Sequence, residues 1–99
     1  MATITFERSG GVIGNEMHLE LAIDSLSDYE AEHLQKLIND ADFFNIPANL
    51  VKQSTPDEFL YRVTVDDGDK NHTVRTTDTT MPRSLLPLVK ELTMLRVLH

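Results

Sequence analysis

Four stretches of the chain alternate apolar and polar side chains, which is the pattern of a β-strand with one buried face. Residues 3–7 and 17–24 form the first two stretches, and residues 59–65 and 72–77 form the other two. A turn signal of three aspartates and one glycine, residues 66–69, separates the later pair, as in a tight hairpin. The pattern therefore predicts two antiparallel hairpins, one in each half of the chain.

A helix is expected between the two hairpins. Ser27 and Glu30 have the spacing of a capping box, in which the serine hydroxyl binds the Glu30 amide and the Glu30 carboxylate returns to the Ser27 amide. Apolar residues then recur at helical spacing and give one stripe: Leu34, Leu37, Ile38 and Ala41. We expect this helix to end near Asp42, because Pro47 stops any continuation.

The last part of the chain predicts a second helix. We place its N-terminal cap at Ser84 and Pro87 in its first turn, where the missing proline N–H costs no hydrogen bond. Its apolar face comprises Leu85, Leu88, Val89, Leu92 and Leu95. The order ββαββα predicts an α+β fold, a four-stranded antiparallel sheet with both helices packed on one face.

Three connecting segments are expected to meet at one edge of this sheet: residues 9–14, 48–57 and 78–83. Strands that alternate in direction, joined by short connections, return to the same edge at every second connection. Loops gathered at one end of a rigid sheet commonly form binding surfaces. We therefore predict that a partner binds at this edge, through Ser9, Gly10, Gly11, Val12, Ile13, Gly14, Gln53, Ser54, Thr79 and Thr80.

The first of these segments has an unusual composition for a turn. It has three glycines in six residues, which permit φ > 0 and close approach to another surface, and it also carries Val12 and Ile13. Two interpretations fit: a plain hairpin turn whose apolar side chains fold inward, or a contact loop that presents them to a partner. We expect a tryptophan at Gly10 or Gly11 to leave the fold intact and to abolish partner binding.

Composition narrows the class of protein. The chain has 99 residues, 40% of them hydrophobic, which suits one compact domain over residues 1–99. The net charge of −7 resides in residues 1–42, where nine acidic residues accompany two basic ones. This acidic half argues against binding to nucleic acid or an anionic membrane and favours a basic partner surface, although a merely solvated face gives the same pattern.

Neither export nor membrane insertion is indicated. Cysteine is absent, and no stretch has the pattern of a signal peptide or a membrane span. We expect a cytoplasmic protein that is monomeric when free.

Candidate catalytic and metal-binding groups lack the required spacing. The histidines at positions 18, 33, 72 and 99 form no HExxH-like or paired motif. The glycine-rich segment has no Walker lysine, Ser9 is not in a nucleophile elbow, and residues 66–69 lack the ligand spacing of a calcium loop. We therefore expect a binding protein without cofactor or metal, and not an enzyme.

Short elements along nearly the whole chain resemble the emfourin family. They are Ser9-Gly10-Gly11 after the first strand, residues 41–47 at the end of the first helix, residues 57–65 and 72–74, and the proline-bearing last helix. The resemblance implies an inhibitor of protealysin-like zinc metallopeptidases of the thermolysin family, which occludes the active-site cleft and performs no chemistry itself. It further implies that Ser9, Gly10, Gly11 and Val12 face that cleft. An acidic adaptor or regulatory binding domain is the alternative function.

Overall fold

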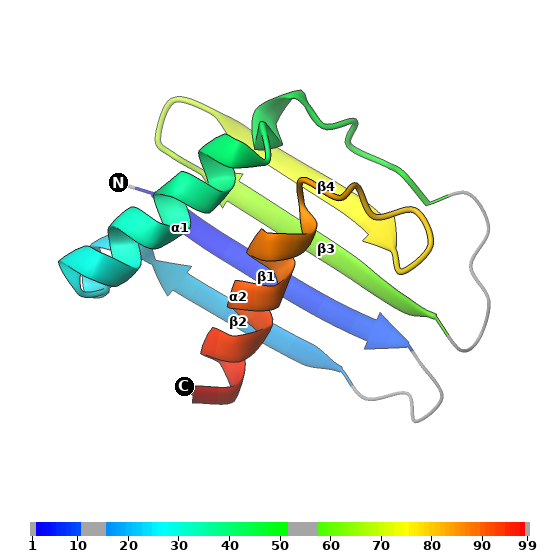
Figure 1. Cartoon of the computed structure of the whole chain (residues 1–99), viewed down its shortest axis with the longest axis horizontal. Coiled ribbons are helices and arrows are strands. Elements are labelled where there is room, and N and C mark those ends of the chain that lie inside the picture. The colour runs from blue at the N-terminus through cyan, green and yellow to red at the C-terminus, as the bar shows by residue number, and fades with distance from the viewer. Residues whose placement is uncertain (1, 11–15, 52–57, 99) are drawn as a thin grey trace.

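A computed structural model describes residues 2–10, 16–51 and 58–98. Within them, four strands and two α-helices follow one another in the predicted order ββαββα (Figure 1). The elements are β1 (Thr3–Gly10), β2 (Met17–Ala22), α1 (Asp28–Asp40), β3 (Phe59–Asp66), β4 (Asn71–Thr77) and α2 (Leu86–Leu98), with two short 3-10 helices, η1 (Ile23–Ser25) and η2 (Phe43–Asn45). The α+β fold expected from the sequence is confirmed.

The strands form one antiparallel sheet in the order β2-β1-β3-β4. β1 and β3 are therefore the two inner strands, whereas β2 and β4 lie at the two outer edges. Phe6 lies opposite Leu19 on one side and Val63 on the other, and Val63 lies opposite Val74. This apolar row crosses the whole sheet and specifies which face is buried, because a shift of one residue would turn every side chain to the other face.

Both helices cover the buried face of the sheet (Figure 1). The strand residues that point toward the helices include Ile4, Phe6, Val63, Val65 and Val74, all at most 2% exposed. They pack against the predicted helix stripes, whose most buried members are Leu34, Ile38, Leu85, Leu88 and Leu92. The other face of the sheet carries threonines and charged residues, and no described helix covers it.

The capping of α1 agrees with the prediction in one hydrogen bond and differs in the other. The Ser27 hydroxyl accepts from the Glu30 amide at 3.2 Å, as expected, but it also donates to the Glu30 carboxylate at 3.1 Å. The carboxylate therefore binds the hydroxyl and not the Ser27 amide. α1 ends at Asp40, and Asp42 has a left-handed backbone, with φ of 51°, that terminates the helical path.

The predicted cap of α2 is wrong. The helix begins at Leu86, and the Ser84 hydroxyl donates instead to the carbonyl of Ala41 at 3.4 Å, at the end of α1. Leu85, which precedes the first helical residue, is fully buried, so the helix entry is held by packing. Pro87 does lie in the first turn, as expected.

The two outer edges of the sheet differ. The Arg75 amide donates to the Ala48 carbonyl at 2.9 Å and the Leu50 amide donates to the Arg75 carbonyl at 2.8 Å, so residues 48–50 cover part of β4. The sequence predicts only a loop at residues 48–50. The bridge uses backbone atoms alone, so no side-chain pattern indicates it. β2 ends two residues earlier than predicted, since Ile23 turns into η1 while remaining buried.

Candidate functional site

One end of the sheet brings together the end of β1, the start of β3 and the segment after β4. Gly10 lies opposite Phe59, and Leu60 lies between Ser9 and Thr77 in adjacent strands. We call this end the glycine edge, defined by Ser9, Gly10, Glu58, Phe59, Asp78, Thr79 and Thr80; it lies at the right in Figure 1. The predicted convergence holds for the described residues of the first and last segments, Ser9, Gly10, Asp78, Thr79 and Thr80, which meet at the start of β3. Gly11, Val12, Ile13, Gly14, Gln53 and Ser54 lie outside the described residues.

Gly10 has a conformation that only glycine adopts readily. Its φ is 87°, and a Cβ atom built on it would lie 2.9 Å from the backbone carbonyl oxygen of Glu58. Real Cβ atoms do not approach a backbone atom so closely, so a larger residue would force β1 away from the start of β3. The expectation that a tryptophan at Gly10 leaves the fold intact is therefore wrong.

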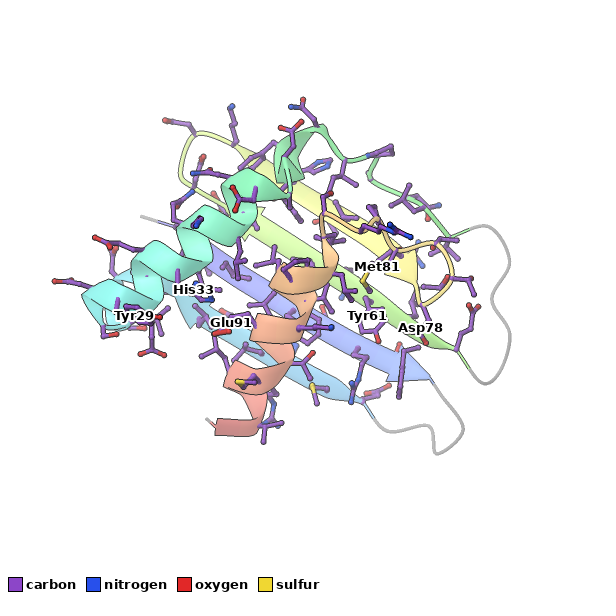
Figure 2. The ribbon with its side chains drawn as sticks, viewed as in Figure 1. Tyr29, His33, Tyr61, Asp78, Met81 and Glu91 are labelled. Carbon is purple, nitrogen blue, oxygen red and sulfur yellow. The ribbon has the colours of Figure 1, made fainter. Side chains whose placement is uncertain are left out.

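Asp78 ties the segment after β4 to the start of β3. Its carboxylate accepts from the Phe59 amide at 3.0 Å and from the Tyr61 hydroxyl at 2.8 Å, and Figure 2 shows Tyr61 and Asp78 side by side near this end of the sheet. Burial of the phenol raises the pKa of Tyr61 to about 12, and the hydrogen bond and charge of Asp78 contribute in the same direction. Tyr61 is thus a neutral donor in the folded protein at ordinary pH.

Thr79 and Thr80 make different contacts at the glycine edge. Thr79 is exposed, and its amide and hydroxyl both bind the Glu58 carboxylate, at 3.2 and 2.6 Å. The Thr80 hydroxyl accepts from the Thr77 amide at 2.9 Å and lies 3.0 Å from the hydroxyls of Thr76 and Thr77. Thr79 therefore faces outward, whereas the Thr80 side chain is engaged in the turn itself.

Arg8 and Phe59 are residues of this region that the sequence analysis did not single out. The Arg8 guanidinium lies 4.3 Å from the centre of the Phe59 ring, and both side chains are half-buried. Both lie on the helix-facing side of the sheet with Tyr61, and Arg8 is directly opposite Tyr61 in the pairing of β1 with β3. The sequence signal for these two residues was that each lies near a strand end, at a position that alternation assigns to the buried face. Alternation alone does not show where the helices stop covering that face.

Comparison with known proteins decides the family. The family model described as Emfourin matches residues 6–93. The chain belongs to the emfourin family. Its fold is similar to that of a solved structure, emfourin (M4in) from Serratia proteamaculans, an M4 family peptidase inhibitor, with 15% sequence identity, 90% of this chain and 86% of that chain covered, and a TM-score of 0.51. No curated protein matches the chain.

In this emfourin-family chain His18, His33 and His72 contact residues of the same fold and not a common centre. The His72 ring nitrogen lies 2.6 Å from the Ile46 carbonyl, and His33 lies 3.6 Å from Glu91, linking α1 to α2 (Figure 2). His18 lies 4.0 Å from each of two glutamates, Glu7 and Glu20. Among the described residues, no three histidines or carboxylates gather as metal ligands would.

A hollow of about 460 Å³ adjoins the glycine edge on the uncovered face of the emfourin sheet. Arg62 forms part of its wall and donates to Glu7 through Nε at 3.1 Å and through Nη2. Ser9 and Arg75 also line it. The surface next to the glycine edge is therefore polar and concave.

Neither of the two described α-helices has the length and hydropathy needed to cross a bilayer.

Proposed function

We propose that this chain inhibits a thermolysin-family zinc metallopeptidase of the protealysin-like type by inserting the glycine edge into the active-site cleft. The observation that carries the proposal is the backbone of Gly10, held in a conformation specific to glycine against the start of β3. Membership of the emfourin family and a fold shared with a protein described as an M4 family peptidase inhibitor support the same class of target.

The wedge of the inhibitor is proposed to consist of Ser9, Gly10, Gly11 and Val12, with Ile13 and Gly14 completing the turn. A segment whose base is already ordered loses little conformational entropy on docking. Glycine residues carry no side chain that would block another backbone, so the wedge suits pairing with the substrate-binding strand of a peptidase, and Val12 or Ile13 suits an apolar subsite.

Flanking contacts are proposed from Thr79, after β4, and from Gln53 and Ser54, in the segment that precedes β3. Thr79 is exposed and is fixed by Glu58, so it presents a rigid surface beside the wedge. The half-buried Arg8 and Phe59 lie next to this surface, and arginine and aromatic residues often dominate binding energy in interfaces. Thr80 contributes by shaping the turn, since its hydroxyl is bound within the segment.

Occlusion requires no chemistry from the inhibitor. We therefore propose a binding protein without cofactor that acts on its target in the cytoplasm. The acidic residues 1–42 would favour approach to a basic surface around the cleft of the peptidase. The alternative, an acidic adaptor, shares the charge, but membership of the emfourin family and the fold shared with a protein described as a peptidase inhibitor favour inhibition.

Titration of a protealysin-like peptidase with the purified protein tests the proposal. We expect peptidase activity to fall with added protein until one equivalent is bound, with competition by a peptide substrate, and thermolysin serves as the selectivity control. Full activity of both peptidases with the protein in large excess would contradict inhibition. A stable complex that retains full activity would favour the adaptor instead.

A further inference from the structure

β2 is an outer strand of the sheet, and no described strand or loop pairs with its free side. The opposite edge, at β4, is partly covered by residues 48–50. A hollow of about 380 Å³ runs beside β2, lined by Leu19, Glu20, Leu21, Ala22, Ser25 and Leu26. β2 therefore offers unpaired backbone groups next to a partly apolar groove.

β2 lacks most of the features by which proteins protect an edge strand, and Glu20 is its one acidic residue. Its sequence, Met17–Ala22, contains no proline, lysine or arginine, and it pairs with β1 in an unbroken register without a bulge. His18 and Glu20 point to the uncovered face of the sheet, whereas Met17, Leu19 and Leu21 point toward the helices. Such a strand is suited to pairing with another strand that has the same alternation.

We propose that the occupant of this edge is a second copy of the chain, paired antiparallel through β2 about a two-fold axis at Leu19. In this register His18 lies opposite Glu20 of the second copy, Glu20 lies opposite its His18, and Met17 lies opposite its Leu21. Both unlike pairs are formed at once, because the contact is symmetric.

Charge selects this register over its neighbours. The two-fold axis is perpendicular to the sheet, so both copies bury the same face. To preserve this, the axis must pass beside one residue of β2, and each alternative register places the axis beside a different residue. An axis at Glu20 would place the two Glu20 carboxylates directly opposite each other. An axis at His18 would place Glu16 opposite Glu20 of the second copy. The axes at Leu19 and Glu20 pair the most residues of β2, and of these two only the axis at Leu19 avoids opposing like charges.

The paired copies would form one eight-stranded sheet whose two glycine edges point in opposite directions. The proposal is therefore independent of peptidase inhibition, since each glycine edge stays accessible. It replaces the expectation of a monomer with a weak, concentration-dependent dimer, because one short strand contributes a small interface.

Disulfide trapping tests the register, and the chain contains no natural cysteine that would interfere. A mixture of His18→Cys and Glu20→Cys chains should form a mixed disulfide, because residues directly opposite across an antiparallel pair lie within disulfide reach. Each variant alone should cross-link far less, since identical positions are then diagonal and about 7–8 Å apart. Equal cross-linking in the single-variant samples, or none in the mixture, would overturn the register.

Sedimentation equilibrium of the unmodified chain and two variants tests the dimer itself. His18→Lys strengthens both unlike pairs and should tighten the dimer about five-fold, whereas His18→Glu places like charges opposite each other and should weaken it by a similar factor. Peptidase inhibition measured at low concentration should be the same for both variants. A chain that stays monomeric to millimolar concentration, or a dimer that both variants leave unchanged, would contradict the proposal.

Discussion

Replacing Gly10 with alanine is expected to lower the free energy of unfolding by about 2–3 kcal/mol. The backbone of Gly10 has a φ of 87°, which costs energy for any residue with a Cβ atom, and that atom would also meet the Glu58 carbonyl at 2.9 Å. In a domain of this size the loss corresponds to a fall in melting temperature of roughly 10–20 °C. Thermal unfolding followed by circular dichroism measures it.

Gly68 supplies the matched control for this substitution. Its φ of 98° is of the same type, but it lies in the turn between β3 and β4, at the opposite end of the sheet. Gly68→Ala should cost only the backbone strain, about 1 kcal/mol, and should leave peptidase inhibition unchanged. If Gly10→Ala were as stable as the unmodified chain, the close approach of β1 to Glu58 would not exist in solution.

Removing the carboxylate of Asp78 is expected to cost about 2 kcal/mol of stability and to release the segment after β4. Asp78 binds both the Phe59 amide and the Tyr61 hydroxyl, and Tyr61 is only 8% exposed. Asp78→Ala therefore leaves a buried hydroxyl without its acceptor. Asp78→Asn, which keeps the shape and one acceptor oxygen, should lose less, and urea unfolding of both variants measures the difference.

The ionisation of Tyr61 reports the same contact independently. Burial and Asp78 raise the pKa of Tyr61 from 10.0 to about 12, so the folded protein favours the neutral phenol. The resulting stabilisation is complete below pH ~10 and is lost as the pH rises through about 12. In a Tyr29→Phe background Tyr61 is the only tyrosine, and near-ultraviolet absorbance should show its pKa falling in Asp78→Asn. An unchanged pKa would show that burial acts alone.

The sequence predicts the framework of the fold because its strands and helices obey simple periodicities. Alternation identified the strands, and helical spacing identified the buried stripes that include Leu34 and Leu88. The convergence of segments at the glycine edge followed from strand direction alone. Strand order did not, because an alternating pattern shows which face is buried and not which strand is the neighbour.

The details that were missed depend on contacts between distant residues. Ser84 is a residue type that often caps helices, but the helix begins two residues later, and the Ser84 hydroxyl donates to the carbonyl of Ala41 once the helices pack. Asp78 reads as an ordinary turn residue until β3 places Phe59 and Tyr61 beside it. Gly10 was recognised as special, but the contact with Glu58 that makes it structural arises only from strand pairing.

The inhibition constant of Gly11→Trp tests the central claim most directly. Gly11 belongs to the proposed wedge, and Asp69→Trp adds the same bulk in the turn at the other end of the sheet. If the glycine edge enters the peptidase cleft, Gly11→Trp should inhibit at least about 100-fold more weakly than the unmodified chain, a change of roughly 2.7 kcal/mol, while Asp69→Trp inhibits normally. Equal inhibition by a folded Gly11→Trp variant would contradict the claim.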